Sequence, residues 1–207
     1  SRAMALFGLF GSKSEREEGA LRKLEHRVKQ RYGQAENRQK AIDQLGDIGT
    51  PAAYRALCAR FTVRTDPGIT DDEEKETVRS ILVEGGKHAI EPVKDFLRRE
   101  ESGVAWGLRI LASLTTPDDV IQTVADLLTQ LGSQYTRDPE KKLVLLSWLA
   151  EHHTADPRIT PALLPLLEDF SDDVRISASH VLSRQTPGDA IREALIQLLL
   201  RDKDNAR

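Results

Sequence analysis

The residues best suited to chemistry are histidines and carboxylates gathered at 151–156. They are Glu151, His152, His153 and Asp156. Such side chains bind divalent metals, and histidine also transfers protons near neutral pH. A metal site needs ligands that converge from several directions, whereas adjacent residues on one turn point apart, and the sequence has no His-x-x-x-His pair. We therefore predict no metal here and interpret the group as a polar corner between two helices.

Other catalytic patterns are missing from the sequence. It has no Gly-rich phosphate loop, no Gly-x-Ser-x-Gly elbow and no Cys/His nucleophile arrangement. The one cysteine, Cys58, excludes an intramolecular disulfide and a multi-cysteine metal site, and it suits a reducing compartment. We expect Cys58 to be a small core residue. The sequence thus predicts no catalytic residues, no cofactor and no enzymatic activity.

The composition predicts an all-α fold. Of the 207 residues, 39% are hydrophobic and 30% are charged, and there are only five Phe, three Tyr and two Trp. Ala, Leu, Glu, Lys and Arg, which favour helices, are abundant. No segment alternates polar and apolar residues in the manner of a strand, and no Asn-Gly or Asp-Gly hairpin signal is present.

A short corner recurs along the chain and divides it into helix pairs. In the clearest copy, 45–53, a helix runs into Gly46 and Gly49 and a second helix restarts at Thr50-Pro51. Thr50 can cap the second helix, and Pro51 suits its first position. The corners are marked by Pro51, Lys87, Pro117, Pro157 and Pro187, with spacings of 36, 30, 40 and 30 residues. Periods of this size are typical of solenoids.

These corners predict one capping helix followed by five helix pairs. The capping helix is expected at 15–32, with Ser14 as its N-cap and Tyr32 in its apolar stripe. We also predict a capping box from Thr70 to Glu73 and an N-cap at Ser171. The pairs are expected at 35–45 and 51–61, 71–83 and 88–99, 103–114 and 118–131, 138–151 and 159–170, and 171–183 and 188–201.

Residues 35–202 resemble the HEAT-like repeat family in its short-period form, as in PBS-lyase HEAT-like repeats, with about thirty residues per helix pair. The resemblance rests on the corner at 45–53, on 172–175 opening a first helix, and on 89–93 and 163–167 opening second helices. It implies a right-handed α-solenoid of about five antiparallel helix pairs, with a capping helix at its N-terminus. We expect a flexible tail at 1–14, of which 1–3 is an expression scar, a capping helix at 15–34, the HEAT repeat domain at 35–202 and a polar tail at 203–207.

In this family the second helices line a concave surface that usually binds proteins. The resemblance therefore implies a cytoplasmic scaffold or adaptor that acts through protein–protein interaction. We expect the partner to contact polar positions of the second helices. These are Tyr54, Arg55, Lys94, Arg98, Gln122, Asp126 and Gln130.

The alternative is a nucleic-acid-binding protein, because some HEAT-like proteins are DNA glycosylases that use concave Trp residues with a carboxylate one turn away. Here Trp106 is followed four residues on by Ile110, and Trp148 by His152. Residues 13–64 hold twelve basic and seven acidic residues, but 65–207 hold seventeen and twenty-six. Phosphate binding would have to use the basic region 16–64, which lacks interleaved aromatic residues. The sequence favours a protein partner.

An apolar peptide precedes the first predicted helix. It contains Leu6, Phe7, Leu9 and Phe10, followed by a polar tether at 12–14. It is too short for a secretory signal or a membrane span. It is either a terminus that frays or folds against the first helix, or a docking peptide for a partner groove or a membrane surface.

Overall fold

The chain is helical throughout the part that the structure describes. The computed structural model describes residues 2–152, 155–186 and 188–205, and the side chains of these residues except 2–12, 190, 202, 204 and 205. Within these ranges there is no β-strand, which confirms the predicted all-α class. None of the described helices combines the length and apolar character needed to cross a bilayer.

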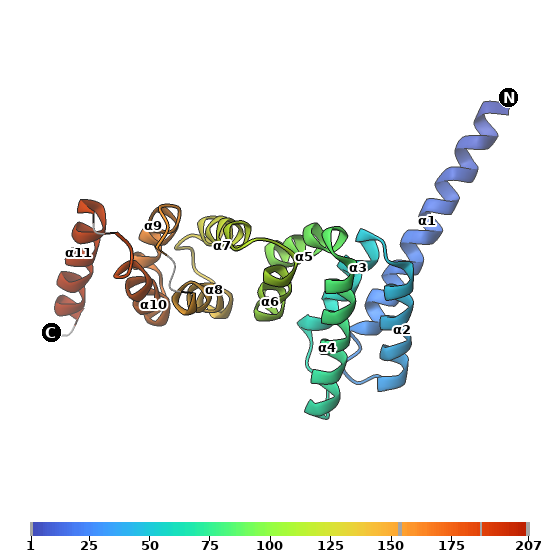
Figure 1. Cartoon of the computed structure of the whole chain (residues 1–207), viewed down its shortest axis with the longest axis horizontal. Coiled ribbons are helices and arrows are strands. Elements are labelled where there is room, and N and C mark those ends of the chain that lie inside the picture. The colour runs from blue at the N-terminus through green and yellow to red at the C-terminus, as the bar shows by residue number, and fades with distance from the viewer. Residues whose placement is uncertain (1, 153–154, 187, 206–207) are drawn as a thin grey trace. The chain divides into compact units, whose positions relative to one another are not determined.

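The helices form two compact units, residues 1–115 and 116–207, called here the N-terminal and C-terminal units. The repeat domain predicted at 35–202 covers parts of both units and stays a prediction. The N-terminal unit contains α1 (Arg2–Val28), α2 (Ala35–Ile48), α3 (Pro51–Cys58), the 3₁₀-helix η1 (Ala59–Thr62), α4 (Gly68–Gly85), α5 (Lys87–Arg99) and α6 (Val104–Leu114) (Figure 1). The C-terminal unit contains α7 (Pro117–Leu131), α8 (Glu140–Glu151), α9 (Ile159–Leu163), the 3₁₀-helix η2 (Leu164–Glu168), α10 (Asp172–Leu182) and α11 (Asp189–Asn205).

Local capping explains why several helices begin where the corners predict. The Ala53 N–H donates to Thr50 Oγ1 at 3.2 Å, and Pro51 opens α3. Before this cap, Gly49 adopts φ 60°, a left-handed conformation that glycine accepts readily, and ends α2. Ser171 caps α10 by accepting from the Val174 N–H at 3.4 Å. The predicted caps at Thr50 and Ser171 are therefore confirmed.

Other predicted boundaries are wrong. Helix α1 begins at Arg2, so Ser14 lies inside it, and it ends at Val28, which leaves Tyr32 outside the helix and 91% exposed. Thr70 is not a cap, because α4 already begins at Gly68. Pro67, whose ring holds φ at −73°, occupies the position before that helix.

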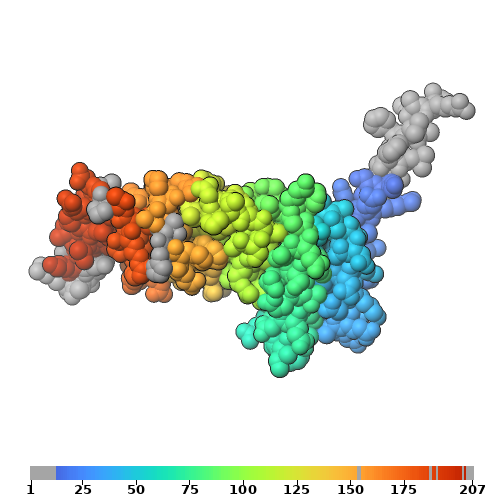
Figure 2. All heavy atoms as spheres, in the orientation of Figure 1, coloured from blue at the N-terminus to red at the C-terminus, as the bar shows by residue number. Residues whose placement is uncertain are grey.

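Each unit has a core built from facing helices, and side chains fill the space between neighbours (Figure 2). In the N-terminal unit α2 packs against α1, α3 and α4, and α5 packs against α3 and α6. In the C-terminal unit α10 packs against α8 and η2, and α7 packs against α9. Fully buried apolar residues include Ile42, Leu45, Leu57, Leu82, Leu97 and Leu111 in the first core, and Leu145, Leu146, Leu163, Leu166, Val174 and Leu182 in the second.

Polar contacts in both units connect residues about one helix pair apart in the chain. Arg38 of α2 pairs with Glu74 of α4, 36 residues later. Arg158 donates to Asp118, 40 residues earlier, and thereby links the start of α9 to α7. The Arg184 side chain donates to the Ala150 carbonyl, 34 residues earlier. These separations match the 30- to 40-residue spacing of the corners.

Candidate functional site

The packed helices α3 and α5 bring together three of the seven predicted partner-binding residues. We define the α3–α5 face by Arg55, Glu91, Lys94, Asp95 and Arg98. Asp95 forms ion pairs with Arg55 at 2.7 Å and with Arg98 at 2.8 Å. Arg98 also forms a longer ion pair with Glu91, at 3.6 Å. Lys94 lies one turn before Arg98 on α5 and is partly buried.

The charges on the α3–α5 face remain accessible to a partner. The side chains of Arg55 and Arg98 are 48% and 44% exposed, so water screens their attraction to Asp95. Exposed ion pairs of this kind contribute about 0–1 kcal/mol to stability. A partner carboxylate can therefore compete for these guanidinium groups at little cost to the fold. The face carries three cations and two anions and can bind a mixed polar surface.

Tyr54 does not lie on the α3–α5 face. Successive residues of an α-helix point about 100° apart, so Tyr54 and its neighbour Arg55 face different surroundings. Tyr54 is only 8% exposed, and its ring lies against the backbone of Gly85. It lines a pocket between α2 and α4 instead.

The remaining predicted residues belong to α7 in the C-terminal unit. Gln122, Asp126 and Gln130 are all exposed, and the Gln122 amide donates to Asp126 at 2.9 Å. Arg158 donates to the Gln122 side-chain oxygen at 3.2 Å. Hydrogen bonds from Arg158 also lower the pKa of Asp156 below its ordinary value. The seven predicted residues are thus divided between the two units, four on the first and three on the second.

The histidine group at 151–156 has ordinary structural contacts. The His152 ring stacks on Trp148 with centroids 3.9 Å apart, and its Nδ1 lies 2.8 Å from the Trp148 carbonyl oxygen. His153 lies outside the described residues. Among the side chains that are described, no three His, Cys, Asp or Glu residues are arranged to hold a metal ion.

Trp106, the tryptophan of the N-terminal unit, also has contacts on its ring. Trp106 stacks on Phe61 with centroids 5.4 Å apart, and the Arg109 guanidinium lies 4.8 Å from its centroid. Trp106 is partly buried and helps to join α6 to η1.

Cys58 of α3 is 1% exposed and belongs to the core, as predicted. Burial raises the pKa of its thiol to about 12.

The N-terminal apolar peptide is part of the backbone of α1. The side chains of Leu6, Phe7, Leu9 and Phe10 lie outside the described residues. In the basic region that follows, Arg38 and Arg60 are buried at 2% and 0% exposure. These two cations are therefore unavailable to phosphates.

Sequence reasoning missed a cluster of five buried ionic side chains in the N-terminal unit. This buried charge network consists of Arg38, Arg60, Asp71, Glu74 and Lys75. Glu74 accepts from Arg38 Nε at 2.9 Å and from Arg60 Nε at 2.8 Å. Asp71 accepts from Arg60 Nη2 at 2.7 Å and from Lys75 Nζ at 2.8 Å. Two carboxylates thus serve three cations and connect α2, η1 and α4.

The network also fixes the loop before α4. Asp71 accepts from the Thr65 N–H at 3.1 Å, and Arg60 donates to the Val63 carbonyl at 3.1 Å. Burial opposes ionisation of Asp71, but the hydrogen bonds from Lys75 and Arg60 outweigh it and lower its pKa to about 2. Among the described side chains, no fully buried polar atom lacks a hydrogen-bond partner. The network therefore has the bonding expected of a structural site.

A smaller buried ion pair occurs in the C-terminal unit. Lys142 of α8 donates to Asp169 at 2.6 Å and to the Gln134 carbonyl at 2.9 Å. Asp169 also accepts from the Ser171 N–H at 3.0 Å, next to the start of α10. The pair holds the 132–137 loop against the corner between η2 and α10.

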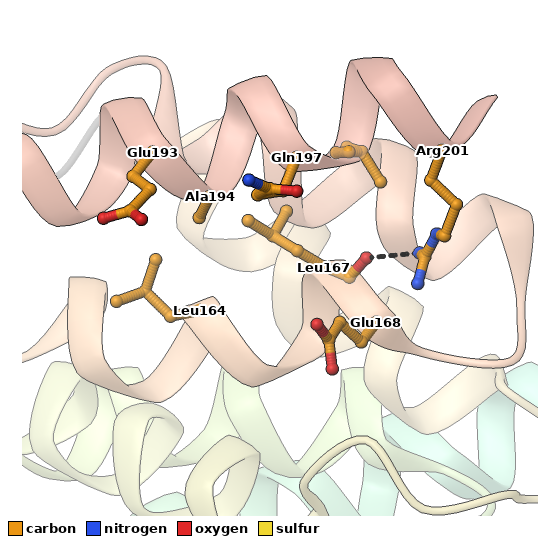
Figure 3. Close-up of a pocket in the computed structure, with 8 residues that line it drawn as sticks. Leu164, Leu167, Glu168, Glu193, Ala194, Gln197 and Arg201 are labelled. Carbon is orange, nitrogen blue, oxygen red and sulfur yellow. Dashed lines mark hydrogen bonds between the residues drawn. The ribbon is translucent and has the colours of Figure 1, made fainter. Parts of the chain in front are cut away.

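A pocket of about 460 Å³ lies between η2 and α11 (Figure 3). Its apolar lining includes Leu164, Leu167 and Leu198. Arg201 donates to the Leu167 carbonyl at 3.0 Å across one end of the pocket. Glu193 also lines the pocket and lies at the opposite end from Arg201 in this view.

The chain has no significant match among known family models, curated proteins or solved structures.

Proposed function

We propose that this chain is a non-catalytic scaffold or adaptor, built as a right-handed α-solenoid of HEAT-like helix pairs, that binds another protein through its second helices. The α3–α5 face carries this proposal. It exposes arginine side chains on two neighbouring helices, and arginine is among the residues that most often dominate binding energy at protein interfaces. Its weak ion pairs set the orientation of a partner and can exchange for contacts across the interface.

The periodic contacts support the repeat architecture. Arg55 and Asp95 join the second helices α3 and α5 at a separation of one corner period. Arg158 and Asp118 form the corresponding link between α7 and α9. Arg38 and Glu74 link the first helices α2 and α4. Similar positions in successive pairs therefore contact each other, as stacking of repeats requires.

Charge reversal on the α3–α5 face tests the proposed function. The full chain is used to capture proteins from lysate of its native host, with and without nuclease, and the captured proteins are identified and quantified by mass spectrometry. We expect Arg55→Glu with Arg98→Glu to reduce capture of the main partner at least about tenfold, which corresponds to about 1.4 kcal/mol. Partner capture should survive nuclease treatment.

The matched control is Lys29→Glu with Lys40→Glu. Both lysines are exposed, both have an i,i+4 ion pair, and the total charge change is the same. Equal loss of capture in the two double variants would contradict a role for the α3–α5 face. Loss of all capture after nuclease treatment would favour nucleic-acid binding through the exposed basic residues of α1.

A further inference from the structure

A second site lies in the N-terminal unit, between the ends of α2 and α4. A pocket of about 520 Å³ is lined there by Asp43 and Asp47 of α2, Glu84 and Gly85 of α4, and Tyr54 of α3. We call it the α2–α4 pocket. Its volume is in the range of pockets that take a small molecule or a single large side chain.

Glycine at position 85 is what allows Tyr54 to reach this pocket. A Cβ atom at Gly85 would lie 2.7 Å from Tyr54 Cζ and 2.8 Å from its hydroxyl oxygen, closer than real contacts permit. The ring therefore lies directly on the backbone of α4. The hydroxyl is also close to Gly49, where an added Cβ would be 3.6 Å away. Tyr54 thus extends from α3 to the end of both first helices.

The Tyr54 hydroxyl is a polar group without a hydrogen-bond partner in the part of the chain that the structure describes. The residue is 8% exposed, so more than nine-tenths of it is buried. Among the described residues none forms a hydrogen bond with its hydroxyl, although Tyr54 lines the pocket. The hydroxyl oxygen is not fully enclosed, because every fully buried polar atom of the described side chains has a hydrogen-bond partner. The hydroxyl is therefore reached from the pocket that Tyr54 lines, and a ligand there can form a hydrogen bond with it.

The charge of the pocket defines the ligand. Asp43 accepts a hydrogen bond from the Gln39 amide at 2.9 Å, which leaves its charge uncompensated. Neither Asp47 nor Glu84 forms an ion pair with any described residue. Three carboxylates and no cation therefore line one pocket, and the complementary ligand is positively charged.

The arrangement favours an extended organic cation over a metal ion. Within the described part of the chain, no three carboxylates converge as metal coordination requires. A guanidinium has five N–H donors in a plane and can bond to several separated acceptors at once. Its apolar stem can also lie along the Tyr54 ring and the Gly46 backbone, which line the same pocket. A lysine ammonium is a compact charge and would reach fewer of these groups.

We propose that the α2–α4 pocket binds an arginine side chain of a partner protein, with Asp47 and Glu84 pairing with the guanidinium and the Tyr54 hydroxyl hydrogen-bonded to it. This inference rests on the proposed protein-binding function and specifies the chemistry of the partner. It gives Tyr54, which the sequence singles out as a partner-binding residue, a contact separate from the α3–α5 face.

Titration of the full chain with short peptides, followed by amide NMR shifts, tests the pocket directly. The probe is an acetylated and amidated Ala-Arg-Ala-Ala peptide. The same peptide with citrulline keeps the shape and loses the charge. We expect saturable shifts at the Gly46, Glu84 and Gly85 amides with the arginine peptide, and at least about tenfold weaker binding with citrulline. Lysine in place of arginine should bind with intermediate strength.

Two sets of variants sharpen the result. Asp47→Asn with Glu84→Gln should weaken arginine-peptide binding at least about tenfold, whereas Asp72→Asn with Glu73→Gln removes two exposed carboxylates of α4 outside the pocket and should leave it unchanged. Tyr54→Phe keeps the ring against Gly85 and should weaken binding about fivefold through the lost hydrogen bond.

The inference is overturned if the pocket amides show no saturable shift, if citrulline binds as well as arginine, or if both carboxylate double variants weaken binding equally. The assay reads the α2–α4 pocket alone, whereas partner capture reads the α3–α5 face. Capture that persists while peptide binding fails would remove this inference and leave the proposed function intact.

Discussion

Both units bury ionic side chains, but they do so in different ways. The N-terminal unit shares two carboxylates among Arg38, Arg60 and Lys75, whereas the C-terminal unit buries a single pair, Lys142 and Asp169, that also binds a backbone carbonyl. In the first unit, each carboxylate has more than one cationic partner. Loss of one carboxylate in the N-terminal unit leaves two buried cations with fewer hydrogen bonds. Loss of Lys142 in the C-terminal unit leaves one buried anion, Asp169, without its cation.

The buried charge network stabilises a corner of the N-terminal unit where helix α3 is short and a long loop precedes α4. Helix α3 ends at Cys58 and continues as η1, so the ladder of α-helical hydrogen bonds stops early. Arg60 in η1 compensates by bonding to Glu74, Asp71 and the Val63 carbonyl. Charged hydrogen bonds thus replace helical backbone bonds at this corner.

The largest effect is expected from Glu74→Gln, which removes the carboxylate shared by Arg38 and Arg60. Breaking a buried ion pair typically costs about 3–5 kcal/mol, because a desolvated charge is left behind. We expect a destabilisation of that size in urea unfolding. The control, Glu76→Gln, changes an exposed carboxylate on the same helix that pairs with Arg79, and should cost less than about 1 kcal/mol. Similar losses for both variants would contradict the importance of the network.

A smaller loss is expected from Lys142→Met in the C-terminal unit. The change leaves Asp169 buried without its cation and should cost about 3 kcal/mol, at the lower end for buried pairs. The double variant Lys142→Met with Asp169→Leu removes both charges and should recover part of that loss. Thermal unfolding of the three proteins measures the effect. A double variant less stable than the single one would show that Asp169 acts mainly through the Ser171 N–H.

Acid should weaken the N-terminal unit through Asp71. Its pKa is about 2 in the folded chain and about 3.9 in an unfolded one. The stabilisation is therefore fully present above about pH 4 and is lost as the pH falls toward 2, and it amounts to about 2 kcal/mol. The stability difference between the native chain and Asp71→Asn should shrink between pH 5 and pH 2.5. Asp72→Asn, on the exposed face of α4, serves as the control, and a difference that stays constant with pH would exclude this role for Asp71.

The smallest effect on stability is expected from charge reversal on the α3–α5 face. Arg55→Glu with Arg98→Glu breaks exposed ion pairs and should change the free energy of unfolding by less than about 1 kcal/mol. The same variant is expected to lose partner capture. Chemical unfolding in parallel with the capture assay separates the two effects. A large loss of stability would show that these arginines stabilise the fold, as the buried charge network does.

The sequence predicts the helices well because their signals are local. Thr50, Pro51 and Ser171 each act within one helical turn, so neighbouring residues are enough to find them. Thr70 fails as a cap because α4 extends back to Gly68, where Pro67 precedes it. The all-α class follows from the same local information.

The buried charges could not be predicted in this way. Arg38 and Glu74 lie on α2 and α4 and are 36 residues apart, and each has the pattern of a solvent-facing residue on its own helix. Their burial depends on how the two helices pack, which no single-helix pattern encodes. The position of Tyr54 on a predicted second helix indicates a partner-binding residue, but its pocket depends on Gly85 of another helix.

The buried thiol of Cys58 can report unfolding of the N-terminal unit by chemical labelling. It is the only cysteine, and its pKa of about 12 keeps it protonated and inert while α3 is packed. A thiol reagent can label the chain only when the N-terminal unit opens, so the labelling rate reports the opening equilibrium of that unit. Each unit also holds one tryptophan, Trp106 in the first and Trp148 in the second. The two units can therefore be followed separately during unfolding without any engineered probe.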